Sequence, residues 1–313
     1  MAAALLAPAP ARAADSVTVV AVGDIAYKTT GAQGRTARLT RALAPSVVLL
    51  PGDVTYGRKV AGVWRATTKT DFKRKFIARS WGPLLSAYPS RVWAVPGNHE
   101  YGRGSRASGY RYLVNRYGLP RQVSGDLWWS RTIVVGGGQW LVLGLDSERL
   151  SDAAKFDREK LFIQQTLAAH DGMPTIVMWH RPRYSRGEHG NQMDAGVKML
   201  WETSTADRDV RLAIWGHDHN FEQATRTGLG GQDVTTIVAG TGGAELRGCP
   251  GYANPTRVAT LDKALYCGTS QAGFRNYGVV ELTLSQDSFA WKYRMVSTTS
   301  STGTVVVSGS KSL

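Results

Sequence analysis

The chain has 313 residues, of which 42% are apolar, and 38 lysines and arginines against 24 aspartates and glutamates give a net charge of +14. It contains no uninterrupted apolar run of about 18 residues, so the sequence predicts a globular protein without a membrane span. The excess of positive charge favours anionic partners such as phosphate esters, nucleic acids or acidic envelope polymers, and does not choose among them.

The first 14 residues are rich in alanine, leucine and proline and include the small-x-small pattern Ala11-Arg12-Ala13. This pattern resembles the end of a secretory signal, and we expect residues 1–14 to be its remnant and the location to be secreted or extracytoplasmic. The alternative is a disordered tail. In an exported chain Cys249 and Cys267 would be expected to pair, whereas in a reducing compartment they would stay thiols.

From residue 15 to residue 313 the sequence has no repeat and no linker, which indicates a single domain. Short apolar runs typical of buried strands alternate with helix-like stretches, which predicts an α/β fold. The expected strands are 17–22, 46–50, 91–95, 140–143, 175–179, 211–215 and 235–239, and the expected helices include 33–43, 71–87 and 152–169. Three further strands, 278–284, 289–296 and 304–307, follow one another and should complete a second sheet.

Polar residues follow the predicted strands. In open α/β sheets the carboxyl ends of the strands form the ligand-binding crevice, so these side chains should converge there. They are Asp24, Asp53, Asn98, His99, Asp146, His180, His217 and His219. His189 lies in the loop after one strand, whereas His170 ends a predicted helix, where a histidine favours the helix dipole.

Carboxylate, amide and imidazole groups without thiols suit zinc, iron, manganese or similar ions. Six or more such groups exceed what one tetrahedral ion uses. Two ions that share a bridging carboxylate account for the number, and such pairs are a recurring device for the hydrolysis of phosphate esters.

The ordered motifs GD at 23, GDxxY at 52, GNHE at 97, a histidine after a strand at 180 and GHxH at 216 resemble the calcineurin-like metallophosphoesterase superfamily. The spacing from Asp53 to Tyr56 resembles its purple acid phosphatase branch. The common superfamily pattern has a histidine where Ala26 stands, and Tyr56 would replace that ligand. The resemblance implies a two-sheet β-sandwich flanked by helices.

Carried over residue by residue, the resemblance implies that Asp24, Tyr56 and His219 bind one metal, that Asn98, His180 and His217 bind the other, and that Asp53 bridges them. The cofactors would be two metal ions, Fe(III) with Fe, Zn or Mn. The resemblance makes His99 and His189 catalytic residues that face the substrate. Taken alone, His99 could be a partly buried structural histidine, and His189 could be an exposed loop histidine.

Weaker expectations concern the surroundings of the site. Asp218 and Glu222 would orient the metal-bound imidazoles, because such imidazoles usually donate to a carboxylate or carbonyl. Arg181, Arg183 and Arg186 would either attract phosphate or be exposed. Asp146 is assigned to loop structure, and Trp128 and Trp129 to packing.

The sequence therefore predicts a metallophosphoesterase that hydrolyses small phosphate monoesters by in-line attack of a metal-bound hydroxide. One alternative is a phosphodiesterase acting on nucleotide or phospholipid diesters, and another is a polyanion-binding protein without activity. No specific nucleic-acid partner is predicted. The sequence does not determine the substrate, the metals, the pH optimum or the oligomeric state.

Overall fold

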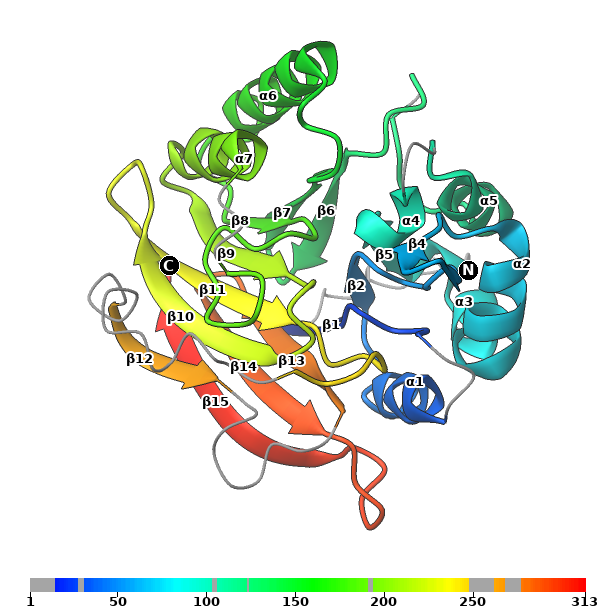
Figure 1. The fold of residues 1–313 in the computed structure, drawn as a ribbon. Coiled ribbons are helices and arrows are strands. Elements are labelled where there is room, and N and C mark those ends of the chain that lie inside the picture. Colours follow the sequence, from blue (N-terminus) through cyan, green and yellow to red (C-terminus); the bar gives the residue numbers. More distant parts are fainter. Residues whose placement is uncertain are drawn as a thin grey trace, which may run out of the picture.

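The computed structural model describes residues 15–27, 31–102, 106–122, 124–190, 194–247, 262–267 and 277–313, with the backbone alone for 262–267. Its strands form two large sheets and a small hairpin of β3 (Lys59–Val60) and β4 (Val63–Trp64). Figure 1 shows the two large sheets at the centre of the molecule with helices on either side. The predicted α/β fold with two sheets flanked by helices is confirmed.

The first sheet has the strand order β15-β14-β13-β1-β2-β5. Its strands β1 (Ser16–Ala21), β2 (Val47–Pro51) and β5 (Val92–Val95) are parallel, so their carboxyl ends lie at the same edge. The antiparallel strands β13 (Gly278–Ser285), β14 (Ser288–Met295) and β15 (Thr304–Ser312) continue the sheet beyond β1.

The second sheet has the order β12-β10-β11-β9-β8-β7-β6. Four of its strands are parallel: β7 (Gly138–Gly144), β8 (Thr175–Met178), β9 (Val210–Trp215) and β11 (Asp233–Ala239). The strands β6 (Trp129–Val135), β10 (Phe221–Thr227) and β12 (Asp262–Cys267) pair antiparallel to their neighbours.

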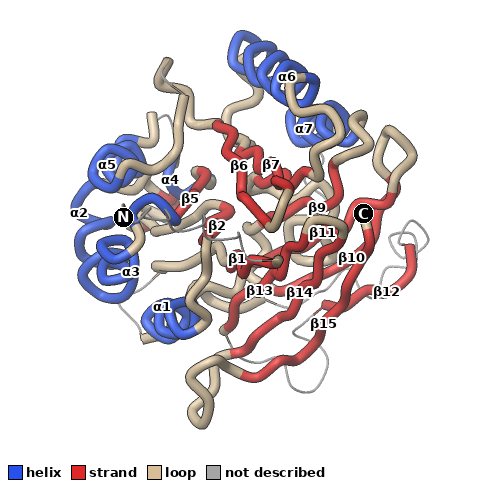
Figure 2. Tube along the Cα trace, turned by 180° about the vertical axis from the view of Figure 1, so that it is seen from behind, coloured by secondary structure: helices blue, strands red, loops and turns tan. Residues whose placement is uncertain are grey.

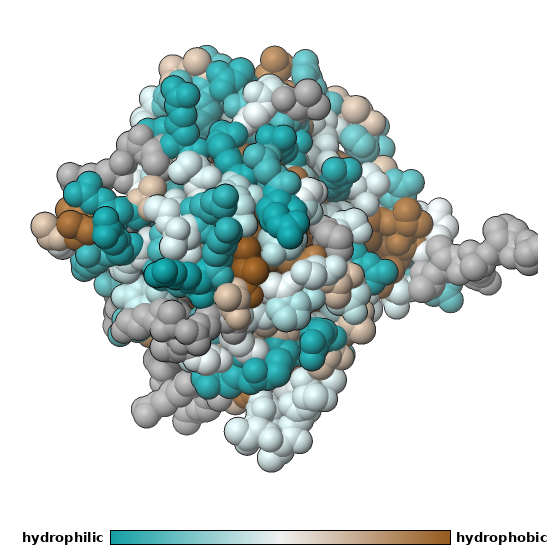
Figure 3. Space-filling model, turned by 90° about the vertical axis from the view of Figure 1, so that its right-hand side faces the viewer, coloured by the Kyte–Doolittle hydropathy of each residue, from teal (hydrophilic) through white to brown (hydrophobic). Residues whose placement is uncertain are grey.

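Helices cover the outer face of each sheet, as Figure 2 shows from behind. The first sheet is covered by α1 (Ala32–Ala42), α2 (Lys69–Asp71), the π-helix η1 (Phe72–Trp81), α3 (Gly82–Ala87) and α5 (Ser108–Tyr117). The second is covered by α6 (Ala153–Ala168) and α7 (Ala195–Thr205). The short helices η2 (Pro89–Arg91) and α4 (Asn98–Tyr101) flank β5. Seen from the side of α1 to α5, the surface is mostly hydrophilic with scattered hydrophobic residues (Figure 3).

The core has three layers because each sheet is covered on both faces. In β2, Leu49 faces the space between the two sheets while Val48 and Leu50 face the helices, and all three are buried. This explains why the parallel strands read as continuous apolar runs in the sequence. Trp128 and Trp129 are buried, in agreement with their predicted role in packing.

The predicted helix over 71–87 is instead three consecutive helical segments, α2, η1 and α3. The N–H of Gly82 bonds the carbonyl of Ile77, five residues back, which is a π-type turn. Pro83 follows, and a proline has no N–H to continue the regular ladder. At the end of α6, His170 Nδ1 lies 2.7 Å from the carbonyl oxygen of Thr166, the cap expected of it. Among the described residues no helix is long and apolar enough to cross a membrane.

Candidate metal centre

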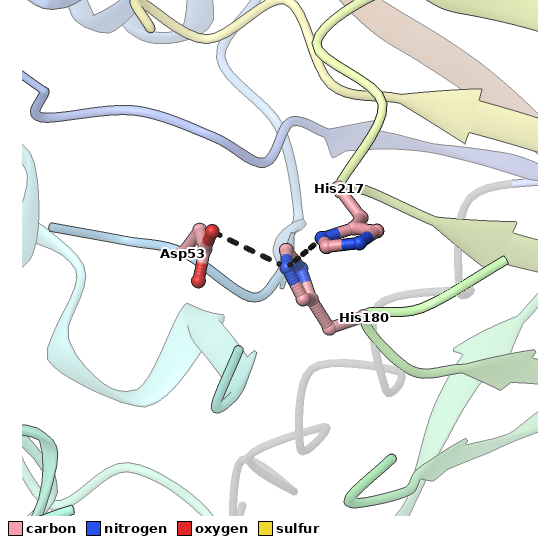
Figure 4. A group of neighbouring side chains, drawn as sticks. All are labelled: Asp53, His180 and His217. Atoms are coloured by element: carbon pink, nitrogen blue, oxygen red, sulfur yellow. Dashed lines mark hydrogen bonds and ion pairs between the residues drawn. The ribbon is translucent and has the colours of Figure 1, made fainter. Parts of the chain in front are cut away.

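Polar side chains from both sheets meet at the carboxyl ends of the parallel strands. Two groups of buried residues each bring their ligand atoms within 4.8 Å of one another: Asp53, His180 and His217 form one, and Asp24, Asp53 and His219 form the other. Figure 4 shows the first of these groups, with the ring of His180 between Asp53 and His217. Asp53 belongs to both groups, so its carboxylate lies where it could bridge two ions.

The group around His180 brings together atoms that would repel one another without a proton or a metal ion between them. The Nδ1–H of His180 donates to the carbonyl oxygen of Pro51 at 2.9 Å, so that Nε2 faces the other residues and has a lone pair whenever the ring is neutral. That Nε2 lies 3.0 Å from Asn98 Oδ1, 3.3 Å from Asp53 Oδ2 and 3.2 Å from His217 Nδ1. Asp53 Oδ2 is buried, with Nε2 of His99 also 3.8 Å away. A cation would satisfy this convergence of acceptors.

The phenol of Tyr56, which the sequence singled out, lies against the second group. The hydroxyl of Tyr56 lies 3.0 Å from Asp24 Oδ1 and 2.8 Å from His219 Nε2. The other nitrogen of His219, Nδ1, donates to the carbonyl oxygen of Glu245 at 2.8 Å, which turns Nε2 toward Asp24. All seven predicted ligands are therefore at one site, and backbone carbonyls orient two of the imidazoles.

The backbone is strained at these positions. Asp24, Asp53, His217 and His219 have φ values of 58°, 46°, 74° and 49°, in the left-handed region. Each such residue costs about 1–2 kcal/mol. Hydrogen bonds between loops hold two of them: Asp24 Oδ2 accepts from the N–H of His217 at 2.8 Å, and Asp53 Oδ1 accepts from the N–H of His99 at 2.9 Å. Strain of this kind concentrates at functional sites.

Burial and neighbouring charges determine which of these side chains carry a proton. Burial raises the pKa of Asp24 to about 8, and the nearby Asp53 adds to the effect. Burial acts to lower the pKa of His180, but the charge of Asp53 outweighs it and the pKa rises to about 10. In the absence of metal, protons on Asp24 and His180 thus balance the buried carboxylates, which is the role a cation would take.

The remaining imidazoles are kept neutral. Burial lowers the pKa of His219 to about 3 and, with the charge of His180, holds the pKa of His217 well below its usual value. Burial also raises the pKa of the Tyr56 phenol well above its usual value, and Asp24 adds to this. Neutral imidazoles keep the lone pairs that metal ligation requires.

The loops that carry the ligands are tied together by Glu100 and Lys75. Glu100 accepts from the N–H of Thr55 at 3.0 Å and of Gly97 at 2.7 Å, and Lys75 donates to the carbonyl of Tyr56 at 2.6 Å. Gly97 is needed because a Cβ there would lie 2.3 Å from Asp53 Oδ1. The sequence indicated no role for Lys75, so this contact was missed.

His99 and His189 lie next to different ligands of the site. The ring centroid of His99 is 4.2 Å from that of Tyr56, and its Nε2 is 3.8 Å from Asp53 Oδ2. Its Nδ1 is buried and makes no hydrogen bond with the described residues. The ring of His189 is 4.3 Å from that of His217, and its Nε2 contacts Arg247. Burial lowers the pKa of both histidines.

A family model described as calcineurin-like phosphoesterase matches residues 17–221, which include every predicted ligand. The chain belongs to this family. Together with the two groups of residues able to hold metal ions, membership makes the protein a metal-dependent phosphoesterase, a hydrolase whose substrate is a phosphate ester. A comparison with curated proteins found no match.

Several solved structures share the fold of this phosphoesterase. GAP50, the anchor in the inner membrane complex of Plasmodium, is 15% identical with a TM-score of 0.60, over 94% of this chain and 88% of that one. PhoD is 10% identical with a TM-score of 0.61, over 97% and 71%. A dimetal phosphatase from Danio rerio is 12% identical with a TM-score of 0.53, over 90% and 96%. At such identities the likeness concerns the fold alone.

In this calcineurin-like phosphoesterase Asp218 and Glu222 do not have the predicted role. Asp218 Oδ1 accepts from the N–H of His189 at 2.7 Å, and Glu222 Oε2 accepts from the N–H of Arg186 at 2.7 Å. Both carboxylates therefore anchor the loop that carries His189. They are not needed to orient His180 and His219, since backbone carbonyls already do so.

Arg181 and Asp146 link the phosphoesterase site to neighbouring loops. The guanidinium of Arg181 forms two hydrogen bonds with Glu148, of 2.8 and 3.2 Å. Asp146 accepts from the N–H of Glu148 at 3.1 Å and from the hydroxyl of Tyr101 at 2.5 Å, which agrees with its predicted part in loop structure. The pairing of Arg181 with Glu148 had no signal in the sequence because 33 positions separate the two residues.

Compared with the wild type, the Glu222→Gln variant of the phosphoesterase is expected to be increasingly stable as pH rises. Burial raises the pKa of Glu222 to about 7, with Asp218 adding to the shift and the N–H of Arg186 and the charge of Arg226 opposing it. The folded wild type therefore retains a proton that the unfolded chain releases, and its stability falls between about pH 4.5 and pH 7. A glutamine at this position would keep the acceptor without the charge.

At pH 8 the gain of Glu222→Gln should approach about 3 kcal/mol, and at pH 4.5 it should vanish. Urea denaturation at several pH values and fixed metal loading measures the difference. The control is Glu202→Gln, since Glu202 is half exposed and its carboxylate pairs with Lys198 on the helix surface. A gain that does not depend on pH would contradict the prediction.

Proposed function

We propose that the protein is a phosphatase of the purple acid phosphatase type, in which two metal ions cleave small phosphate monoesters. The observation that carries this proposal is the position of Tyr56, whose hydroxyl lies between Asp24 and His219 where the common superfamily pattern would place a histidine. Ala26, at the position of that histidine, is buried and too small to reach the site.

In this proposal Asp24, Tyr56 and His219 hold one ion, Asn98, His180 and His217 hold the other, and Asp53 bridges them. Ions at these positions would supply the Lewis acidity that activates water and neutralises charge on the phosphoryl group. The neutral oxygen of Asn98 limits the negative charge of the ligand set. His99, close to both Tyr56 and Asp53, donates a hydrogen bond to the phosphoryl group or a proton to the leaving oxygen, and His189 faces the substrate from the side of His217.

The ratio of kcat/KM for nitrophenyl phosphate to that for bis-nitrophenyl phosphate tests the proposal, on enzyme whose metal content has been measured. A strong preference for the monoester supports it. A preference for the diester would make the protein a phosphodiesterase, and turnover of neither ester with both metals bound would leave a polyanion-binding protein.

The Tyr56→Phe variant should lose a visible absorption band. We propose Fe(III) at the ion that Tyr56 contacts, with Fe, Zn or Mn at the other, because a tyrosinate stabilises ferric iron and gives it colour. Phenylalanine keeps the ring that packs against His99 but has no oxygen to bind the metal. Spectra of the iron-loaded proteins test this, with Tyr110→Phe as control, since Tyr110 is also fully buried but is not a predicted ligand. A band that survives in Tyr56→Phe would refute the tyrosinate.

We also propose that residues 15–313 form a single catalytic domain that is exported after removal of residues 1–14. Those 14 residues and Cys249 lie outside the described part of the chain, and Cys267 lies in β12, where the backbone alone is described. The small-x-small pattern at Ala11 to Ala13 supports export. N-terminal sequencing of the secreted protein would test the cleavage site, and mass spectrometry without reduction would test the pairing of the cysteines.

A further inference from the structure

A cavity of about 430 Å³ lies beside the candidate metal centre. Its polar lining comes from the loop after β7, from the residue after His180 and from the start of α7. The polar side chains are those of Ser147, Glu148, Arg149, Ser151, Arg181 and Asp194. The volume is within the range of sites for small molecules, roughly 300–1,000 Å³.

Arg181 forms a wall that the cavity shares with the metal centre. Its Nη1 lies 3.4 Å from His217 Nε2, while its Nε and Nη2 donate to the two oxygens of Glu148. The N–H of Arg181 also donates to Ser147 Oγ at 3.1 Å. A guanidinium held by two parallel hydrogen bonds has a fixed orientation. A molecule bound in the cavity therefore lies next to the ligands of one metal.

Arg149 connects the cavity to the helix α4, which carries Asn98 and His99. Its guanidinium lies 5.8 Å from the ring centroid of Tyr101, in the same short helix α4 as Asn98 and His99. Arg149 has a φ of 60°, so its backbone is in the left-handed region. Two residues of the lining thus contact the segments of the site: Arg149 contacts the helix that carries His99, and Arg181 contacts His217.

The lining of the cavity contains both hydrogen-bond donors and hydrogen-bond acceptors. Glu148 and Asp194 are acceptors, the two arginines are donors, and the serine hydroxyls are both. Asp194 is fixed because its Oδ1 accepts from the N–H of Val197 at 2.7 Å, as the cap of α7. The two arginines and two acids cancel in charge. A neutral group with several adjacent hydroxyls, each a donor and an acceptor, satisfies such a lining better than an apolar or a charged one.

We propose that this cavity binds the alcohol part of the substrate, and that the substrate is a phosphorylated sugar or polyol. This inference rests on the proposed monoesterase function. The phosphoryl group would lie at the metal centre beside Arg181, and the sugar hydroxyls would bond Ser151, Asp194 and Arg149.

Glucose 6-phosphate and methyl phosphate provide the test, because both are esters of primary alcohols and only the first reaches the cavity. The ratio of kcat/KM for glucose 6-phosphate to kcat/KM for methyl phosphate should be at least ten in the wild type. The variant Ser151→Trp fills the cavity from an exposed turn and should reduce this ratio at least tenfold. Ser310→Trp, on the exposed edge strand β15, should leave the ratio unchanged.

Equal kcat/KM values for the two esters in the wild type, or an equal loss of both in Ser151→Trp, would overturn the inference. Calorimetric binding of glucose 6-phosphate to the metal-loaded protein gives a second measurement that does not need turnover. If the wild type cleaves no monoester, the proposed function fails. The inference then depends on binding alone: loss of binding in Ser151→Trp supports the cavity, and unchanged binding refutes it.

Discussion

Replacing Asp53 with asparagine is expected to remove both metal ions and to lower kcat/KM for a phosphate monoester by more than about 10³-fold. The loss of one hydrogen-bond donor from an active site costs about 10²–10³-fold. Asp53 contributes more because it belongs to both groups of candidate ligands. Asparagine keeps the acceptor for the N–H of His99, so the loop should stay in place while the bridging charge is lost.

Asp24→Asn is the matched comparison, because Asp24 is buried like Asp53 but belongs to one group only. Metal analysis of the purified variants, with kinetics at saturating added metal, should give no ion for Asp53→Asn and one for Asp24→Asn. If Asp53→Asn still binds two ions, Asp53 is not the bridge.

Gly52→Ala should destabilise the protein by about 3 kcal/mol or more and should also weaken metal binding. Gly52 has a φ of 81°, where alanine costs about 1–2 kcal/mol. A Cβ there would also lie 2.5 Å from His180 Nδ1 and 2.7 Å from two further atoms of that side chain. Overpacking of this kind adds about 1–3 kcal/mol. The ring of His180 would have to move away from the carbonyl of Pro51 that orients it.

Gly62→Ala separates the two contributions. Gly62 has a similar φ of 76°, but a Cβ there would meet no atom within 4 Å. The Gly62→Ala variant should therefore lose only the stability that a left-handed backbone costs an alanine, and it should bind metal normally. Chemical denaturation and a metal titration on both variants test the prediction, which would be wrong if the two glycines proved equally tolerant of alanine.

The position of the site could be predicted from the sequence because local patterns specify it. A strand buried on both faces reads as an apolar run, and the residue after it lies at the carboxyl edge of the sheet. Asp24, Asp53, Asn98, His180 and His217 all follow such runs, and the structure brings them together. Strands with a less regular pattern, such as β6 and the polar β10, were missed, as were α5 and α7.

Interactions between distant segments could not be predicted. The carbonyls of Pro51 and Glu245 orient imidazoles, and a backbone carbonyl has no signature in a sequence. The ion pair of Arg181 with Glu148 and the contact of Lys75 with the Tyr56 loop depend on how the loops pack. The left-handed backbone conformation at four of the ligands could not be predicted from the sequence either, because aspartate and histidine are not specific for that conformation.

The strand order of the first sheet determines when the metal site can form during synthesis. Strand β1, which leads into Asp24, pairs with β2 on one side and on the other with β13, whose residues 278–285 come more than 250 positions later in the sequence. Half of the strands of that sheet, β13 to β15, are therefore made after every candidate ligand. Contacts this distant in sequence form slowly and late. All the candidate ligands are therefore synthesised before the sheet that positions Asp24, Asp53, Tyr56 and Asn98 is complete, so stable metal loading should follow the synthesis of β13 to β15.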